Sequence, residues 1–319
     1  MPSTIDVIIP THGGREITSS CLRHLAKQTF DHRVIVVDNA SPDGSVERLQ
    51  ADFPAISMIA LDQNRGFGAA CNAGIAASRG AIVVLMNNDV DAEPTLLAEL
   101  AAAFETDPQL GSVAPLLLRP DGRIDSVGLC ADSTLAGFPR LQGRQASEAG
   151  STRPLLLGPA GSVAAYRRAA LDEVGLFDER LFMYQEDLDL ALRLRAGGWG
   201  SCSAIQARAV HHGSATVGRR SASQRQLQAF ARGYMLRAYG VGGARQAART
   251  VVTELIVAGG DLVISRDGAA WRGRVAGWRA GHQTTRRRLP TEGIDSAIGV
   301  RDSLRLRRVD YSAAPPIGR

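Results

Sequence analysis

The chain has 319 residues, of which 45% are hydrophobic and 22% charged, so its composition excludes a disordered protein and allows a large buried core. Its net charge of +5 conceals an uneven distribution, because residues 1–218 carry 18 basic and 25 acidic side chains whereas residues 219–308 carry 18 and 6. Four scattered cysteines without CxxC spacing argue against a zinc site or a disulfide framework. An apolar segment begins at Ile5, which leaves no room for a secretory leader, and we expect a cytoplasmic protein.

Short apolar runs alternate with amphipathic segments in the first part of the chain. The candidate strands are residues 5–10, 33–38, 56–61, 81–87 and 111–118. This alternation predicts an α/β fold with a mainly parallel central sheet flanked by helices. Ligands of such sheets collect at the carboxyl ends of the strands, so we expect the functional residues there.

Polar residues follow most of these candidate strands. They are Pro10-Thr11-His12-Gly13, Asp38-Asn39-Ala40-Ser41, Asn64-Arg65-Gly66 and Asn87-Asn88-Asp89-Val90-Asp91. The turn after the first strand lacks a GxGxxG pattern, and the chain contains no GK[ST] sequence, which argues against a dinucleotide-binding domain and a P-loop. The sequence DNASPDG at 38–44 also favours a tight turn, so Asp38 has a purely structural interpretation as well.

Residues 119–158 are rich in Gly, Pro and Ser and have weak periodicity, which predicts a long, mobile insertion before a helix that begins near Arg167. Farther on, Glu186, Asp187 and Asp189 open a segment with helical spacing. Taken alone, these acids are explained by the helix dipole and by an Asp189–Arg193 ion pair. A catalytic pair of carboxylates is the alternative.

The region from 219 to 319 is predicted to be a mostly helical, basic extension that follows a first domain spanning 1–218. All 18 basic residues between 219 and 308 are arginines. Such a region could lie on an anionic membrane surface, and a solvated helical face is the alternative. No nucleic-acid recognition motif accompanies the charge, so we expect no nucleic-acid partner.

The longest apolar run of this extension, residues 251–264, is interrupted by Glu254 and Asp261. It is too short to span a bilayer, so we expect no transmembrane helix there.

Six segments taken in order resemble the family 2 glycosyltransferases of the GT-A fold, and most closely the rhamnosyltransferase-like members that build bacterial cell-wall or surface polysaccharides. The segments are VIIPTHG, VIVVDNASPDGS, NRGFGAACNAGI, VVLMNNDV, GSVAAYRRAALDEVGLFDERLFMYQEDLDLALRLRAGGW and AVHHGSAT. The resemblance covers residues 5–218. It implies inverting, metal-assisted transfer of a sugar such as L-rhamnose from a nucleoside diphosphate donor to a polyprenyl-linked saccharide, at the inner face of the plasma membrane.

The resemblance also implies roles for single residues on the donor side. Those matching the family's donor-binding positions are Pro10, Thr11, Asp38, Asn64, Gly66 and Asn88. The triplet Asn87-Asn88-Asp89 occupies the place of the family's DxD motif, so Asp89, with His211 and Asp91, would hold Mg²⁺ or Mn²⁺. An amide, Asn87, stands where the motif has its first acid, so the protein supplies less charge to the cation. His211 could instead donate a hydrogen bond to phosphate without any metal.

Asp187 matches the general base of the family, and Glu186 would position the acceptor or tune Asp187. Because an unperturbed Asp has a pKa of about 3.9, the site must desolvate Asp187 or use Glu186 to raise its proton affinity. Tyr184 and Trp199 either flank the sugar or belong to the core. Two other functions stay open, namely a nucleotidyltransferase on a related fold and a catalytically silent nucleotide-sugar-binding protein.

Overall fold

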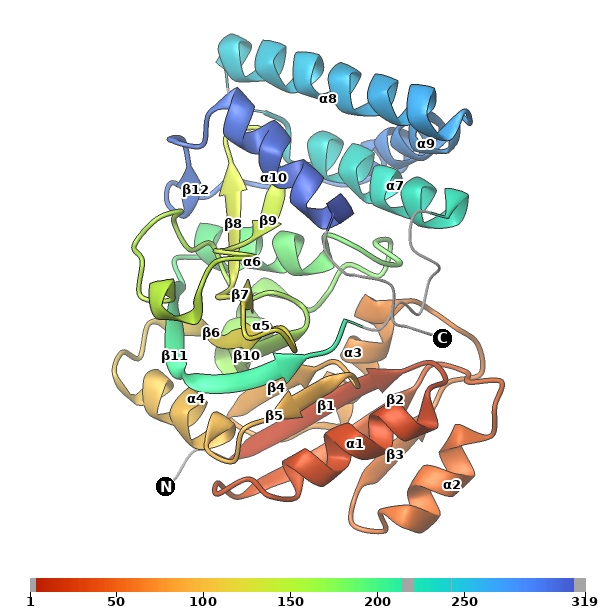
Figure 1. Cartoon of the computed structure of the whole chain (residues 1–319), viewed down its shortest axis with the longest axis vertical. Helices are drawn as coiled ribbons and strands as arrows, with labels where there is room; N and C mark the ends of the chain where they lie inside the picture. Colours follow the sequence, from red (N-terminus) through yellow and green to blue (C-terminus); the bar gives the residue numbers. More distant parts are fainter. Residues whose placement is uncertain (1–3, 214–220, 242, 313–319) are drawn as a thin grey trace.

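The computed structural model describes residues 4–213, 221–241 and 243–312, with side chains up to residue 307, so the end of the AVHHGSAT motif lies outside the described residues. Its main sheet has the strand order β3-β2-β1-β4-β10-β6-β11-β5 (Figure 1). In that order the strands are Ser57–Ala60, His32–Asp38, Ile5–Thr11, Ile82–Met86, Val163–Arg167, Leu110–Leu118, Gly200–His211 and Val90–Ala92.

Strands β3, β2, β1 and β4 run parallel, as the alternation of apolar runs and helices predicted. The other half of the sheet is mixed. Strand β10 lies antiparallel between β4 and β6, and β11 runs parallel to β6 but antiparallel to β5. The five expected strands are all present, whereas β10 was not predicted although it joins the two halves of the sheet.

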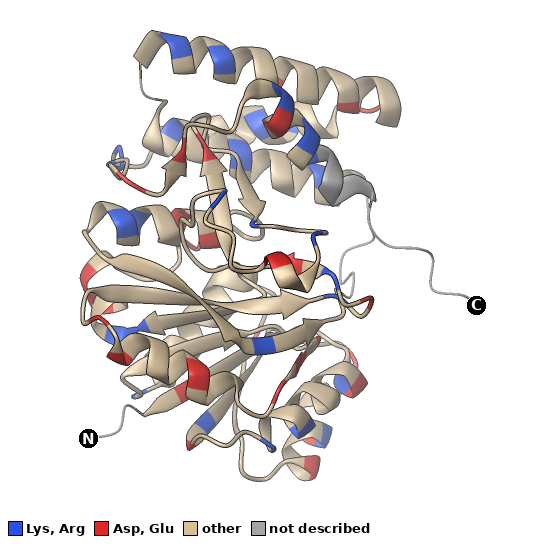
Figure 2. Cartoon of the chain, turned by 60° about the vertical axis from the view of Figure 1, so that its left-hand side comes forward, with Lys and Arg blue, Asp and Glu red and all other residues tan. Residues whose placement is uncertain are grey.

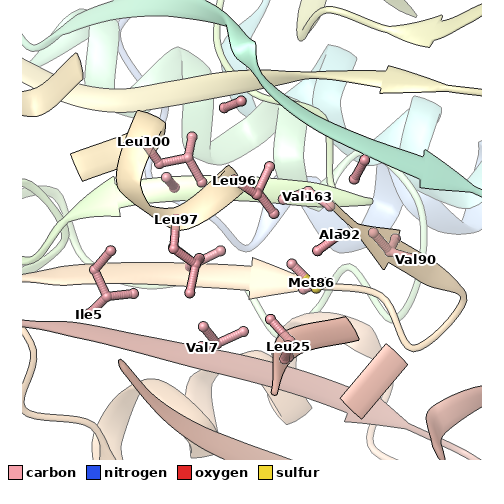
Figure 3. Packing of buried hydrophobic residues seen from close by; sticks show 14 of the residues in the cluster. Ile5, Val7, Leu25, Met86, Val90, Ala92, Leu96, Leu97, Leu100 and Val163 are labelled. Carbon is pink, nitrogen blue, oxygen red and sulfur yellow. The ribbon is translucent and has the colours of Figure 1, made fainter. Parts of the chain in front are cut away.

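Helices cover both faces of this sheet. They are α1 (Arg15–Leu25), α2 (Ser45–Asp52), α3 (Phe67–Ala77), α4 (Leu96–Glu105), α5 (Arg168–Val174) and α6 (Glu186–Ala196). Successive side chains of a strand point to opposite faces, so Val7 packs with Leu25 and Leu97 on one face while Ile8 packs with Ile75 on the other. Figure 3 shows the first of these clusters, which α1 and α4 close.

Residues 119–158 do not form the unstructured insertion that their composition predicted. They contain β7 (Ile124–Ser126), β8 (Leu129–Asp132), β9 (Gly137–Pro139) and the short 3₁₀ helix Ala146–Glu148. Strand β7 pairs with β6, and β8 joins β9 and β12 (Ile294–Asp295) in a second, three-stranded sheet. All four residues of β8 are buried, so the strand carries no alternating pattern that sequence reasoning could detect.

The C-terminal region is mostly helical, as predicted. It contains α7 (Ala222–Tyr239), α8 (Gly243–Ser265), α9 (Ala269–His282) and α10 (Val300–Ser312). Contacts cross the proposed boundary at residue 218, because β12 pairs with β8 and the buried Arg232 of α7 donates to the backbone oxygens of Thr134 and Leu135. The division into two domains stays a prediction.

Across the ranges that the structure describes, no helix combines the length and the apolar character needed to cross a membrane, as expected for residues 251–264. Helix α8, which contains this run, lies at one end of the long axis of the molecule, and α2 lies toward the other (Figure 1).

Candidate active site

The Asn87-Asn88-Asp89 turn leaves the end of β4 and leads directly into β5. The side-chain amide of Asn88 donates hydrogen bonds to Thr11 Oγ1 at 3.1 Å and to Thr18 Oγ1 at 3.0 Å. Thr11 and Thr18 are buried, and Pro10 is buried beside Thr11 at the end of β1. The side-chain nitrogen of Asn88 therefore fastens the turn to the start of α1. The donor-binding roles expected of Pro10, Thr11 and Asn88 stay predictions.

Asp89 lies against His211 at the end of β11. The distance from His211 Nε2 to Asp89 Oδ1 is 3.3 Å, and His211 Nδ1 lies 2.8 Å from Asp125 Oδ2. Burial alone would lower the pKa of His211, but the hydrogen bonds to Asp125 and Asp89 outweigh burial and raise it to about 10. Sequence reasoning missed Asp125, because it comes from the segment after β6 and only the pairing of β7 with β6 brings it to His211.

Asp91 does not join Asp89 and His211. Its carboxylate lies 2.7 Å from His212 Nε2 and 3.1 Å from His24 Nδ1. The adjacent residues His211 and His212 thus face different acids, as expected of neighbours along a strand. Within the described part of the chain, no three His, Cys, Asp or Glu side chains form a group able to hold a metal. The structure brings two of the three predicted ligands together and directs the third elsewhere.

Asp38 forms the tight turn that its sequence context suggested. Its carboxylate accepts hydrogen bonds from Ser41, one from the backbone N at 2.9 Å and one from the hydroxyl. The following residue, Asn39, is buried and donates to Asn64 Oδ1 at 3.0 Å and to Gly66 O at 3.1 Å. Asn39 was not predicted as a site residue, although its place at a strand end beside Asp38 was a usable signal. Asn39 therefore connects the end of β2 to the loop before α3.

Position 66 must be a glycine because two loops pack closely against each other there. Its φ is +88°, and a Cβ there would lie 2.2 Å from the backbone oxygen of Phe182. The same oxygen accepts a hydrogen bond of 2.9 Å from Phe67 N. The close neighbour of Gly66 is therefore the segment that leads to α6. Donor contacts by Asn64 and Gly66 stay predictions.

Helix α6 begins with the predicted acids. Tyr184 and Gln185 precede it with φ values of 74° and 62°, a left-handed conformation that is costly for residues other than glycine. Glu186 is buried, and its Oε2 has no hydrogen-bond partner among the described residues. Burial and the neighbouring charge of Asp187 raise the pKa of Glu186 to about 8, so Glu186 is mostly protonated at neutral pH.

Asp187 is joined to the Asn87-Asn88-Asp89 turn by the two residues before β10. Its Oδ2 accepts a hydrogen bond from Gly161 N at 2.9 Å, and the next residue, Ser162, accepts one from Asn87 N through its backbone oxygen at 2.9 Å. Leu188 N donates to the other carboxylate oxygen at 2.7 Å. Burial raises the pKa of Asp187, and these backbone N–H groups oppose the rise in part. The structure therefore places the predicted base and the predicted metal turn on one hydrogen-bonded segment.

Other acids and aromatics near α6 are structural. Asp189 pairs with Arg193 at 2.9 Å, as the helical spacing predicted. Trp199 donates to Glu173 and packs on Gly111 near the beginning of β6, at the opposite end of that strand from His211. Trp199 therefore belongs to the core and cannot flank a sugar at the strand ends. Tyr184 packs against the hydrophobic cluster around α6 and α7.

Comparison with known sequences indicates the family and a relative of this chain. Residues 6–175 match the family described as Glycosyl transferase family 2. The N-acetylglucosaminyl-diphospho-decaprenol L-rhamnosyltransferase of Mycobacterium tuberculosis is 32% identical over 215 residues, which cover 60% of this chain and 69% of that protein.

Two solved structures share the fold at low identity. The crystal structure of GalNAc-T7 with UDP, GalNAc and Mn²⁺ is 14% identical with a TM-score of 0.59, over 79% of this chain and 50% of its own. The mannosyltransferase PcManGT from Pyrobaculum calidifontis, in complex with GDP-Man and Mn²⁺, is 18% identical with a TM-score of 0.51, over 88% and 87%. These likenesses confirm the predicted GT-A fold. The match over more than half of the sequence shows that the chain belongs to glycosyl transferase family 2.

Proposed function

We propose that this glycosyltransferase moves a sugar, with L-rhamnose as the first candidate, from a nucleoside diphosphate to a hydroxyl of a polyprenyl-linked saccharide, and inverts the anomeric centre. One observation carries the proposal. The segment Gly161-Ser162 binds Asp187 on one side and the Asn87-Asn88-Asp89 turn on the other. The sugar and the lipid-linked acceptor are suggested by the name of the mycobacterial relative.

The donor diphosphate would lie beside Asp89 and His211, and these residues fit a divalent cation. A metal-bound imidazole usually donates its other N–H to a carboxylate, and His211 has Asp125 in that position. Mg²⁺ commonly takes only one or two carboxylates from a protein and completes its shell with phosphates and water, so Asp89 would meet that need and His211 would add a nitrogen ligand. When bound, the cation would neutralise charge on the departing diphosphate. Asp91 would have to leave His212 to assist.

The acceptor side is assigned to α6. Asp187 would take the proton from the acceptor hydroxyl while that oxygen attacks the anomeric carbon, a contribution of roughly 10²–10⁴ in rate. Its raised pKa makes it a stronger base than a free aspartate, and the N–H groups of Gly161 and Leu188 hold its orientation. A single displacement inverts the configuration. Glu186 would keep its proton at neutral pH and tune Asp187.

The remaining donor-side residues act through the shape of the strand-end loops in this proposal. Asp38, Asn64 and Asn88 already hold these loops by hydrogen bonds within the protein, so they would present the loop surface to the nucleoside. A polyprenyl-linked acceptor resides in a membrane, so we place the protein at the cytoplasmic face of the plasma membrane.

A donor panel tests the proposal. We would measure nucleoside diphosphate release and thermal stabilisation with deoxythymidine, uridine and guanosine diphosphate sugars, with Mn²⁺, Mg²⁺ or a chelator, for the wild type and Asp89→Ala. The matched control is Asp121→Ala, an exposed acid in a surface turn. We expect one donor to stabilise the protein and to be hydrolysed slowly, only with metal and only when Asp89 is present. Turnover that persists in chelator would instead indicate that His211 donates a hydrogen bond to phosphate without any metal.

A donor that stabilises the protein but is never transferred or hydrolysed would point to a silent nucleotide-sugar-binding protein. The anomeric configuration of the product, read by proton NMR, tests inversion separately.

A further inference from the structure

Helix α8 has its polar and apolar faces reversed relative to an ordinary surface helix. Thr253 is fully buried and Glu254 is largely so, whereas Val263 and Ile264 are 76% and 83% exposed. Ten of the twelve exposed large hydrophobic residues found in the described part of the chain lie on α8 and α9. They are Val251, Val252, Leu255, Ile256, Leu262, Val263, Ile264, Trp271, Val275 and Trp278. Exposed apolar residues gathered on two neighbouring helices in this way mark an interaction site.

The inner face of α8 is held by ion pairs. Glu254 contacts Arg232, Arg274 and Arg307 at 2.9, 3.0 and 2.8 Å. Near the end of the helix, Asp261 pairs with Arg225 of α7 at 3.2 Å. These contacts fix the rotation of α8 about its own axis. Because the acids of the helix face inward, its aliphatic residues face outward.

Helix α9, which contacts α8, adds exposed aromatic and basic residues. Glycines line the face of α9 that packs on α7, and a Cβ on Gly277 would lie 1.9 Å from the backbone oxygen of Phe230 in α7. Its outer face carries Trp271, Val275 and Trp278, and Arg237 of α7 stacks on Trp278 with 5.8 Å between the guanidinium and the ring centroid. Tryptophan and arginine are side chains that favour the boundary between headgroups and acyl chains.

The exposed charged side chains of α8, α9 and the segment between them have one sign. From residue 243 to 282, every exposed charged side chain is an arginine, namely Arg245, Arg266, Arg272 and Arg279. The acids of the same stretch are engaged in ion pairs, since Asp261 and Asp267 both contact Arg225 and Glu254 is paired as above. Long uncharged stretches separate the charged bands of α8 (Figure 2). An anionic lipid surface complements this arrangement, because it accepts aliphatic side chains and attracts the arginines.

We propose that the outer faces of α8 and α9 form a surface that docks onto anionic lipid. The proposal deepens the proposed function, since it rests on the need of a lipid-linked acceptor for an enzyme held at the bilayer. It also differs from the interpretation of the sequence, in which the arginines of the C-terminal region were the reason to expect membrane contact. The aliphatic ridge of α8 enters the headgroup boundary, and arginines surround that ridge. The arginine content alone does not define the surface.

Vesicle sedimentation of the full chain tests this surface. The probes are vesicles of phosphatidylglycerol with phosphatidylcholine, and vesicles of phosphatidylcholine alone. Val263→Asp combined with Ile264→Asp changes two highly exposed residues, so the fold should be kept, and its melting temperature checks this. The control is Val300→Asp, at an exposed hydrophobic residue outside the surface. A second variant, Arg272→Gln with Arg279→Gln, tests the charge.

We expect the wild type and Val300→Asp to bind anionic vesicles, and the double variant with Val263→Asp and Ile264→Asp to bind them about tenfold or more weakly. The arginine variant should lose the preference for anionic over neutral vesicles. Equal binding by the wild type and the double variant would overturn the proposal, as would no binding by the wild type. Wild-type dimers that the double substitution dissociates, without vesicle binding, would assign the surface to a second copy of the chain.

Donor hydrolysis without any acceptor, measured on the same variants, separates this proposal from the proposed function. We expect the hydrolysis rate to be unchanged by Val263→Asp with Ile264→Asp, because the surface lies outside the strand-end site. If the wild type binds vesicles but hydrolyses no donor, the docking surface stands and the proposed function fails.

Discussion

Arg287, in the segment that follows α9, forms an ion pair with Asp189 of α6, two residues after the proposed base Asp187. Arg287 also pairs with Asp178, and Asp189 is fully buried and accepts a hydrogen bond of 2.8 Å from the Tyr239 hydroxyl. The C-terminal region therefore supports the first turn of the helix that carries the catalytic candidates.

Replacing Arg287 by Leu should destabilise the protein by about 1–3 kcal/mol, because it removes the charged donor shared by Asp189 and Asp178, although Asp189 keeps Arg193. Turnover should fall more than donor affinity, since α6 carries Asp187 and the donor residues lie at the ends of β1, β2, β3 and β4. Arg288→Leu, at the exposed neighbouring residue, is the control. Equal melting temperatures for the two variants would show that the ion pair does not support α6.

Asp187→Asn should keep donor binding and lower turnover by roughly 10²–10⁴, because the amide cannot accept the proton of the acceptor. The comparison variant is Asp172→Asn, an exposed acid of α5. Steady-state transfer and donor titration by calorimetry separate the two effects. Near-normal turnover in Asp187→Asn would remove Asp187 as the base.

Stability should depend on pH through Glu186. Its pKa is about 8 in the folded protein against about 4.5 when exposed, so the unfolded chain releases a proton that the folded chain retains. The free energy of unfolding should therefore fall as pH rises from about 4.5 to 8, by up to about 1.4 kcal/mol per pH unit. Glu186→Gln should flatten this slope and raise the melting temperature most above pH 8. Parallel pH profiles for the two proteins would contradict the assignment.

Asp125→Asn should raise the Mn²⁺ concentration needed for half-maximal donor hydrolysis roughly 10–100-fold, because Asp125 orients His211 rather than touching the ion. Added Mn²⁺ should restore the rate. Asp121→Asn, in the turn before β7, should leave the metal requirement unchanged. If Asp125→Asn lost activity that no Mn²⁺ concentration restored, a role limited to orienting a metal ligand would be excluded.

The parallel half of the fold was predictable because its strands are continuous apolar runs, such as β4, in which all five residues are buried. The acids that open α6 and the polar strand ends were likewise visible as motifs. Strand β10 escaped prediction because its pattern adjoins a helix, and β8 and β9 escaped because they are short and lack alternation.

Partnerships between distant segments could not be predicted from the sequence. Asp125 acquires its role only when β7 folds onto β6, and Asp91 is drawn to His212 and His24 rather than to Asp89. The acids of α8 marked it as too polar to span a bilayer. Which of its faces points inward was set by Arg232, Arg274 and Arg307, each from a different element.

Strand β12 has a consequence for folding during synthesis. The edge of β8 that pairs with β12 stays uncovered until residues 294 and 295 have left the ribosome. The same residues bring Asp295, whose carboxylate accepts hydrogen bonds from Arg153 and from Leu155 N. A nascent chain that already contains the whole strand-end site therefore still carries an open sheet edge, which can pair with other chains. The emergence of residues 294 and 295, rather than completion of the site, ends this exposure.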